Sequence, residues 1–387
     1  MLIAPDKFKG SLTARQAAEA IATGVLEAAP DSDVTLLPVA DGGEGTIDAL
    51  VAAGAMIHQL RVRGPLGDAT HASWASFEDT AVVEMAQAAG LQLIQQPSTA
   101  TAEAASTYGV GQLIRDALDH GFRTIVVAAG GVGSTDGGAG ALSALGLTIL
   151  DQAGVPITRI KDLEHAASLD LSGWDPRLAD TEIFVATDVS VPLLGPRGAA
   201  RLFAPQKGAN PAAVERLECR LANWNGILVN AFAVDVSNTA GVGAAGGFAT
   251  GFLAAGVARI VPGAQLIGEL IGLEAAIASS DLVVVGEGSL DDQSLEGKAP
   301  IAIARVARTL DIPVIALAGT IQSAARHELS ANGIWSADCI MDIAEDAEDA
   351  MTNAYPMLRV LAARTIARFG SAKPQNVALH SAYGSPA

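Results

Sequence analysis

Lysines are scarce in this chain and concentrated in turns. The segment APDKFKGSL (4–12) places Lys7 and Lys9 on either side of one phenylalanine, directly after a short apolar run. The 387 residues include only six lysines, and the formal net charge is −18. Four of the six lie in glycine-containing turns: Lys7, Lys9, Lys207 and Lys298. Because an ammonium group is a compact charge that suits mobile phosphate oxygens, this placement indicates phosphate handling.

Three glycine turns combine charged residues with the expected start of a helix. They are DKFKGS (6–11), DGGEGT (41–46) and GEGSLDDQS (286–294), and each follows an apolar, strand-like run. Helix N-termini favour anions, and in open parallel sheets ligands bind beyond the carboxyl ends of the strands. We therefore expect the three turns at one rim. The residues expected to bind substrate or phosphate there are Lys7, Ser11, Gly42, Gly43, Glu44, Ser289 and Lys298.

Three segments in the middle of the chain offer further candidates. GGVGSTDGGAG (130–140) follows a strand-like run, VATDVSVPLLG (185–195) leads into Asp188, and FAPQKGAN (203–210) carries Lys207. The additional binding candidates here are Gly130, Gly131, Ser134, Asp136 and Gln206.

The segment 130–140 also keeps a nucleotide-binding alternative open. It lacks the lysine of a P-loop, but it nearly fits a dinucleotide fingerprint, with Asp136 in place of the third glycine. Asp151, twenty residues after Gly131, could mimic the acid that binds the ribose. An NAD-dependent dehydrogenase is therefore one alternative function.

Acidic residues in and around these turns exceed what helix capping requires. They are Asp6, Asp41, Glu44, Asp136, Asp188, Glu287, Asp291 and Asp292. Carboxylates can hold Mg²⁺, and one can accept a hydroxyl proton during phosphoryl transfer. The six histidines show no ligand spacing, and two cysteines are too few for a disulfide frame or a zinc site.

The bulk composition argues against several classes of protein. A pI near 4.6 disfavours nucleic-acid binding, because that binding depends on lysine and arginine. No apolar run reaches the about 18–20 residues of a membrane span. The start MLIAPDK leaves no room for the apolar part of a signal peptide. We expect a cytoplasmic protein without nucleic-acid or membrane partners.

Strands and helices alternate at both ends of the chain. Strands are expected at 2–5, 34–39, 281–289, 313–319 and 339–343. Helices are expected after the capping box Thr13-Ala-Arg-Gln16, after 41–43, and at 299–310, 322–331 and 345–368. This alternation predicts an α/β fold with a doubly wound parallel sheet.

The length of the chain predicts two domains, and the extended stretches and many glycine turns of its middle part predict that a second α/β domain is inserted into the first. We expect a discontinuous domain at 1–57 plus 263–370, an inserted domain at 58–262 and a disordered tail at 371–387. Two chain crossings would give a hinged pair of lobes with a cleft.

Many motifs occur in a characteristic order along residues 2–368. They include IAPDKFKGSLTA, PVADGGEGT, GPLGDATHASW, VVEMAQAAGLQL, GVGQLIRDAL, TDGGAGALSALG, LSGWDPRL, LFAPQKGA and DLVVVGEGSLDDQSLEGKAP. In this order they resemble the type 1 glycerate kinase family, which phosphorylates D-glycerate with ATP. The resemblance implies a flavodoxin-like domain interrupted by an inserted α/β domain, with the site between them. ATP and Mg²⁺ are the implied cofactors, and a homodimer is compatible with the resemblance.

The resemblance also assigns roles, for a kinase that converts D-glycerate to 2-phosphoglycerate. Asp188 is expected to be the base or to orient the hydroxyl, with Asp41 as the second candidate. Glu287 and Asp291 are expected to help hold Mg²⁺.

The cations are expected to neutralise the transferring phosphoryl oxygens, through Lys9 and Lys207. Relatives often carry serine at the position of Lys7, so Lys9 is expected to be the more important lysine of the opening turn.

Four positions depart from the family pattern. Val132, Thr135 and Val191 replace a serine and two asparagines, and Ser289 replaces an arginine. That arginine would clamp a carboxylate through two bonds, so Lys9, Lys207 or backbone N–H groups must bind the acid, or the acid is not glycerate. A kinase of a related hydroxy acid and a non-catalytic sugar-acid-binding protein therefore stay open. The choice between the 2- and 3-hydroxyl, the lobe that binds ATP and the oligomeric state also stay open.

Overall fold

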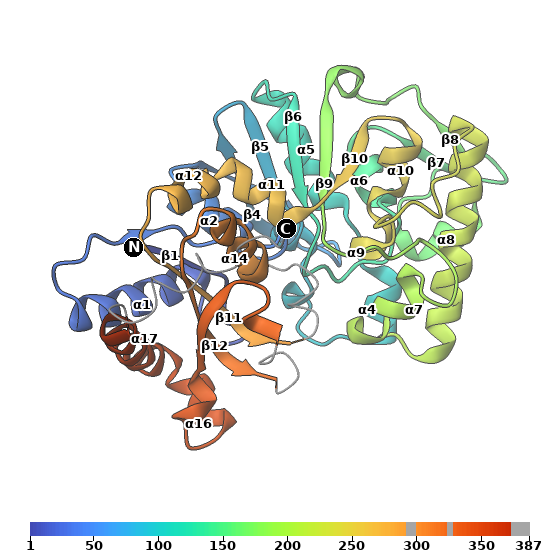
Figure 1. Cartoon of the computed structure of the whole chain (residues 1–387). Helices are drawn as coiled ribbons and strands as arrows, with labels where there is room; N and C mark the ends of the chain where they lie inside the picture. Colours follow the sequence, from blue (N-terminus) through green and yellow to red (C-terminus); the bar gives the residue numbers. More distant parts are fainter. Residues whose placement is uncertain (292–298, 323–327, 373–387) are drawn as a thin grey trace, which may run out of the picture. The chain divides into compact units, whose positions relative to one another are not determined.

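The chain begins in one compact unit, crosses into a second and returns to the first. The computed structural model describes residues 1–291, 299–322 and 328–372 (Figure 1). Unit 1 comprises Met1–Val39 and Ile271–Ala387, and unit 2 comprises Ala40–Leu270.

Unit 2 extends beyond the insertion expected at 58–262. Residues 40–57 and 263–270, expected in the discontinuous domain, fall in unit 2. The reason is packing. Helix α2 (Thr46–Ala52) contacts strands β4 (Ala69–Phe77) and β5 (Thr80–Glu84), and helix α11 (Gly263–Leu270) contacts strand β9 (Glu182–Ala186).

Unit 1 is built on a five-stranded parallel sheet. Its strands are β1 (Leu2–Pro5), β2 (Thr35–Leu36), β11 (Val283–Leu290), β12 (Val314–Ile321) and β13 (Ile334–Cys339). They lie in the order β2-β1-β11-β12-β13, which is 2-1-3-4-5 in chain order within the unit. This is the order of flavodoxin-like sheets, and it confirms the expected doubly wound parallel fold.

Helices cover the sheet of unit 1. They are α1 (Ala14–Ala28), α12 (Leu273–Ala278), α14 (Ala299–Thr309), the 3₁₀ helix η5 (Ile340–Asp342), α16 (Ala347–Thr352) and α17 (Ala354–Ala372). The capping box expected at the start of α1 is present, since Thr13 Oγ1 accepts from Gln16 N–H and Gln16 Oε1 accepts from Thr13 N–H. The apolar face of α1 shares a core with α17, and Figure 1 shows the two helices side by side.

Two strands of unit 1 differ in length from the expectation. β2 is short because Pro5, on β1, has no N–H to donate to the Leu37 carbonyl, although Leu37 N–H still donates to Ile3. β11 ends at Leu290, one residue beyond the expected end at 289, and it includes residues 286–290, which were also expected to form a glycine turn. Its pairing with β12 makes the GEGSL segment part of the strand.

The carboxyl-terminal elements also differ. The fifth strand, expected at 339–343, lies earlier in the chain and ends at Cys339, and Ile340–Asp342 form η5 instead. The helix expected at 345–368 is divided at Asn353, because Pro356 has no N–H and is tolerated only in the first turn of a new helix. The tail expected at 371–387 lies outside the described residues apart from Ser371 and Ala372, which end α17. Half of the helix expected at 322–331, residues 323–327, also lies outside them.

Unit 2 contains a six-stranded mixed sheet. Its strands are β3 (Met56–Arg63), β4 (Ala69–Phe77), β5 (Thr80–Glu84), β6 (Thr124–Ala128), β9 (Glu182–Ala186) and β10 (Ala258–Val261). The order is β10-β9-β6-β5-β4-β3, with the first four strands parallel and the last two antiparallel. A separate antiparallel pair is formed by β7 (Thr148–Asp151) and β8 (Ala166–Asp170).

The helices of unit 2 surround these sheets and enclose one large apolar core around Trp74, Trp224 and Phe252. The α-helices besides α2 and α11 are α3 (Ala86–Ala89), α4 (Thr99–Ala104), α5 (Tyr108–Asp119), α6 (Ala139–Ala144), α7 (Ala199–Phe203), α8 (Pro211–Phe232), α9 (Ala244–Gly247) and α10 (Ala249–Ala254). The 3₁₀ helices are η1 (Leu91–Leu93), η2 (Ile160–His165), η3 (Pro176–Asp180) and η4 (Pro205–Lys207). Among the described helices, none combines the length and apolar character that crossing a bilayer would need.

Candidate active site

The DGGEGT segment lies in unit 2, where it meets loops that follow the parallel strands of that sheet. A Cβ added to Gly42 would come within 2.9 Å of Gly263 Cα and 3.3 Å of the Cβ of Ala186, the last residue of β9. A Cβ on Gly130 would come within 2.6 Å of Gly43 Cα. These approaches require glycine, and they bring the loops after β6, β9 and β10 together at the carboxyl ends of the strands.

Asp188 lies at the centre of this meeting point. It follows β9, and its two carboxylate oxygens accept from the N–H groups of Gly263 (2.8 Å) and Ala264 (3.1 Å) at the start of α11. Burial of the carboxylate raises the pKa of Asp188, the two N–H donors oppose this, and the charge of Asp41 raises the pKa further. The two carboxylates are therefore electrostatic neighbours, and a raised pKa suits a proton acceptor.

Asp41 and its neighbours complete this cluster. The Asp41 carboxylate accepts from Gly43 N–H at 3.2 Å, which holds it within its own turn. A Cβ on Gly131 would lie 3.6 Å from Glu44 Cβ, and Glu44 itself is exposed. The structure thus brings together seven residues that the sequence singles out, namely Asp41, Gly42, Gly43, Glu44, Gly130, Gly131 and Asp188.

Lys207 is buried rather than presented to solvent. Its side chain is 2% exposed, and its ammonium group donates to the Ser134 carbonyl and, at 3.4 Å, to Thr135 Oγ1. Burial lowers the pKa of Lys207 to about 8, and the charge of Asp136 opposes the shift. An ammonium group held in this way clamps the 134–135 loop, in contrast to the expected direct contact with phosphoryl oxygens. The adjacent Gln206 is exposed.

Asp136 is a buried junction between two helices. Its carboxylate accepts from the backbone N–H and hydroxyl of Thr107 at 2.8 Å each, and from the N–H groups of Gly138 (3.1 Å) and Gly140 (3.2 Å). Burial raises the pKa of Asp136. This carboxylate ties α5 to α6 and occupies the amide groups that a pyrophosphate would need. The hydroxyl of the neighbouring Ser134 is buried and has no hydrogen-bond partner among the described residues.

Asp151, which the sequence suggested as a ribose-binding acid, also has a structural role. Asp151 accepts from the N–H groups of Ala153 (2.8 Å) and Val155 (2.9 Å), so it caps the turn after β7. Neither Asp136 nor Asp151 is arranged to bind NAD.

The three glycine turns do not share one rim as expected, because DGGEGT belongs to unit 2, and only the DKFKGS turn and the described start of GEGSLDDQS meet in unit 1. A Cβ on Gly288 would lie 3.0 Å from Lys9 N, so the DKFKGS turn lies against the end of β11. Asp6 accepts from Lys7 N–H at 2.6 Å and pairs with the Lys7 ammonium at 3.4 Å. Lys9 is exposed, and Ser11 Oγ closes the turn by donating to the Phe8 carbonyl at 3.1 Å.

The remaining predicted residues lie along β11 or beyond it. Ser289 is inside the strand, opposite Thr320 of β12, and Lys298 lies outside the described residues. Glu287 is also inside the strand and Asp291 follows it, so an extended chain would separate their Cα atoms by about 13 Å.

The described carboxylates fit one kind of magnesium site. No group of three or more His, Cys, Asp or Glu side chains with the arrangement of a metal site occurs within the described part of the chain. Magnesium that arrives with ATP needs only one or two protein carboxylates, because phosphate oxygens and water supply the other ligands. Single carboxylates such as Glu287 or Asp291 therefore fit a metal carried by the nucleotide, rather than an all-protein cage.

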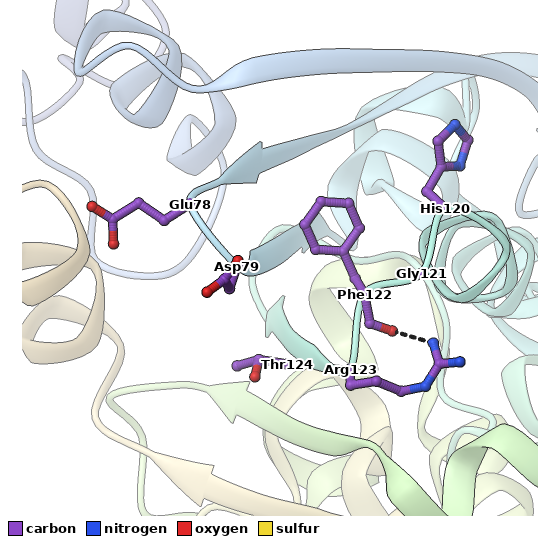
Figure 2. A pocket seen from close by; sticks show the side chains of 7 residues that line it. All are labelled: Glu78, Asp79, His120, Gly121, Phe122, Arg123 and Thr124. Carbon is purple, nitrogen blue, oxygen red and sulfur yellow. Dashed lines mark hydrogen bonds between the residues drawn. The ribbon is translucent and has the colours of Figure 1, made fainter.

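A surface pocket of unit 2 does not coincide with these residues. Figure 2 shows this pocket of about 470 Å³, which is lined by Glu78, Asp79, His120, Gly121, Phe122, Arg123 and Thr124. Its lining lies at the amino-terminal ends of β5 and β6, whereas the Asp41–Asp188 cluster lies at the carboxyl ends of the parallel strands. Arg123 donates to the Phe122 carbonyl (2.8 Å), so one N–H group of its guanidinium is already hydrogen-bonded within the loop.

Two functional candidates escape a reading of the sequence alone. Glu84 and Thr107 are both buried, and they bind the DGGEGT and 130–140 segments from elsewhere in the chain. The signal for Glu84 is an acidic residue at the end of the apolar run AVVE, where burial of a charge needs a reason.

Comparisons with known proteins identify the family of this chain. The glycerate kinase family model matches residues 1–370. A glycerate 2-kinase of Escherichia coli K12 is 41% identical over 330 residues, which cover 83% of this chain and 85% of that protein. A glycerate kinase of Bacillus subtilis 168 is 40% identical over 363 residues, which cover 92% and 93%.

A solved structure is similar over nearly the whole chain. It is a crystal structure from Salmonella typhimurium LT2 described as that of a candidate glycerate kinase 2, and it is 38% identical. The TM-score is 0.81, and the match covers 96% of this chain and 98% of the other. Sequence and structure agree over both units, and the chain therefore belongs to the glycerate kinase family and is a kinase.

Proposed function

We propose that the chain transfers the γ-phosphoryl group of ATP to the 2-hydroxyl of D-glycerate, giving 2-phosphoglycerate and ADP. The observation that carries the proposal is the Asp41–Asp188 carboxylate pair, held by backbone N–H groups at the carboxyl ends of the unit 2 strands. The name of the Escherichia coli relative, glycerate 2-kinase, supports the choice of hydroxyl.

Asp188 accepts the proton of the attacking hydroxyl. As that oxygen forms its bond to the γ-phosphorus, the bond from the γ-phosphorus to the bridging oxygen breaks and ADP leaves. The two N–H donors of Gly263 and Ala264 fix the orientation of the carboxylate before the substrate binds. The nearby charge of Asp41 makes Asp188 a stronger proton acceptor by raising its pKa.

Cationic groups balance the charge of the phosphates. Lys9 is exposed at the turn against β11, and we assign it to the phosphoryl oxygens or to the glycerate carboxylate. Mg²⁺, held by Glu287 or Asp291 when ATP binds, would neutralise phosphate oxygens. Lys207 acts indirectly, because its ammonium group fixes the 134–135 loop.

A kinase of a related hydroxy acid is the second candidate, and one observation favours it. The family pattern that the sequence resembles implies an arginine where this chain has Ser289, which lies in β11 opposite Thr320 and supplies no guanidinium to clamp a carboxylate. Two of the other departures from the family pattern, Val132 and Thr135, are buried, with exposed fractions of 7% and 1%.

ADP release across a panel of small hydroxy acids tests the proposal. We expect D-glycerate to give the highest kcat/KM, no ADP release when the acid is omitted, and no turnover without Mg²⁺. A different acid with the highest kcat/KM would favour the second candidate. No ADP release with any acid would refute the proposed reaction.

A further inference from the structure

A buried carboxylate at the end of β5 contacts the first turn of α2. Glu84 is the last residue of β5, its side chain is 2% exposed, and Oε2 accepts from Ile47 N–H at 3.1 Å. A second backbone hydrogen bond comes from Gly45. Burial raises the pKa of Glu84, while these N–H donors oppose the rise. A buried carboxylate is tolerated only when hydrogen-bond donors compensate for its lost hydration, as these backbone groups do.

The start of α2 depends on this carboxylate. Helix N-termini leave N–H groups without partners in the helix, and a side chain at the N-cap normally accepts from one of them. The N-cap of α2 is Gly45, in a left-handed conformation with φ 91°, and it makes no side-chain cap. Because α2 has only seven residues, its first turn needs external support, which Glu84 supplies from a neighbouring strand.

The first turn of α2 is directly linked to Asp41. Thr46 Oγ1 donates to the Gly43 carbonyl at 2.7 Å, and Gly43 N–H donates to the Asp41 carboxylate at 3.2 Å. A shift at Gly45 or Ile47 would therefore move the turn that carries Asp41. Asp41 in turn influences Asp188 through its charge.

We propose that Glu84 is a positioning residue for the kinase reaction, whose carboxylate fixes the start of α2 and so keeps Asp41 beside Asp188. The inference rests on the proposed function, because that function gives Asp188 its role as proton acceptor. The carboxylate is specifically suited to this position, since it accepts at both oxygens and donates at neither. In Glu84→Gln an NH₂ donor replaces one of the two accepting oxygens.

Two substitutions test the role in catalysis. We expect Glu84→Gln to lower kcat by roughly 10- to 100-fold, and Glu84→Ala to lower it further, because the carboxylates near the reacting hydroxyl are displaced. The acid limb of the kcat/KM profile should move to lower pH in both variants, because Asp41 no longer raises the pKa of Asp188. Wild-type kcat together with an unchanged acid limb in Glu84→Gln would overturn the proposal.

Asp116→Asn is the matched control. Asp116 is also a carboxylate of unit 2 that accepts from an N–H group, that of the Trp74 indole at 2.8 Å, but nothing in the described structure links it to the Asp41 turn. We expect wild-type kcat and pH profile. An equal loss in the control would show that any lost carboxylate bond in this unit impairs activity, and would overturn a specific role for Glu84.

Hydrogen exchange of the whole protein gives a readout that does not depend on activity. In Glu84→Gln we expect faster exchange of the amides at 42–47, while those of β6 keep their wild-type protection. Unchanged exchange at Gly45 and Ile47, or equal loss of protection throughout unit 2, would overturn the proposal. If the wild-type protein did not phosphorylate glycerate, the exchange result would still decide whether Glu84 holds this turn, so the two failures can be told apart.

Discussion

Asp188 combines three properties that a proton acceptor in phosphoryl transfer needs. It follows a strand at the carboxyl edge of a parallel sheet, two backbone N–H groups orient it, and burial with a neighbouring carboxylate raises its pKa. Each property follows from local chain geometry. The role can therefore be tested with a substitution that keeps the size of the side chain.

We expect Asp188→Asn to lower kcat by about 10²- to 10⁴-fold, the range of general-base catalysis, with the fold intact by circular dichroism. Asp151→Asn is the control, because Asp151 also accepts from two backbone N–H groups but caps a turn after β7. The control should keep wild-type kcat. Activity of Asp188→Asn within a few-fold of wild type would remove Asp188 from the mechanism.

The two lysines of the opening turn should contribute unequally. Lys7 is paired with Asp6, whereas Lys9 is exposed at the turn that lies against β11. We expect Lys9→Ala to lower kcat/KM by about 10- to 100-fold, the value of a charge-assisted hydrogen bond, and Lys7→Ser by much less. Steady-state kinetics of both variants would decide. Equal losses would contradict this division of roles.

Residue types and spacing singled out Asp41 and Asp188 because each follows an apolar, strand-like run, but they assigned Asp41 to the rim of the first sheet and Asp188 to the inserted domain. The two carboxylates are neighbours because the DGGEGT segment packs within unit 2. The burial of Lys207 could not be predicted in the same way. A lysine in a glycine turn looks the same in a sequence whether it faces solvent or a carbonyl such as that of Ser134. Only the packing of the 134–135 loop shows that Lys207 faces a carbonyl and not solvent.

At the scale of elements, close contact between loops shapes the candidate site. The loop after β6 touches the DGGEGT segment through Gly130 and Gly43, with no room for a side chain. Strands fix where these loops begin, and the glycines allow them to meet.

Gly130→Ala tests the closeness of these loops. Its Cβ would lie 2.6 Å from Gly43 Cα, so the backbone must move, and we expect kcat to fall by about 10-fold or more. Gly226→Ala is the control, since it is exposed within α8 and a Cβ there would meet no atom within 4 Å. The control should keep its activity and gain roughly 0.5–1 kcal/mol of stability in urea unfolding. Unchanged kinetics in Gly130→Ala would show that the loop after β6 and the DGGEGT segment can move apart without loss of activity.

The clamp formed by Lys207 should appear in the pH dependence of stability. Below about pH 8 Lys207 is protonated in both states, but between about 8 and 10.5 only the unfolded chain keeps the proton. The unfolded state then binds more protons, so wild-type stability should rise with pH relative to Lys207→Met over this window. Urea unfolding can follow this through the fluorescence of tryptophans including Trp224, whose indole donates to Gly137 beside the loop. If the difference in the free energy of unfolding between wild type and Lys207→Met stayed constant from pH 7 to 10, this would contradict a buried Lys207 that loses its proton in this range.

The succession of strands and helices along unit 1 was predictable because apolar runs and glycine turns alternate, but element ends were not always predictable. β11 extends through the GEGSL segment because β12 continues to pair with it up to Ile321. Glycines suggest a turn when read alone, whereas a partner strand can keep them extended. The division before α17 did have a readable cause in Pro356.

At the scale of the whole molecule, the insertion was predictable and its limits were not. The N-terminal and C-terminal parts each supply strands to a single flavodoxin-like sheet. The assignment of residues 40–57 to unit 2 depends on contacts such as that of Glu84 with Ile47, 37 residues apart in the chain. Local patterns can mark Glu84 as unusual, but they do not show which distant residue it contacts. The family match covers residues 1–370 and so includes both units.

Product analysis tests the central claim most directly, namely that this kinase phosphorylates the 2-hydroxyl of D-glycerate. The protein is incubated with ATP, Mg²⁺ and D-glycerate, and the new phosphorus signal is examined by proton–phosphorus correlation NMR. We predict coupling to the single C2 proton, and no product with Asp188→Asn in the same time. Coupling to the two C3 protons, or no glycerate-dependent phosphorus signal with the wild-type protein, would contradict the account.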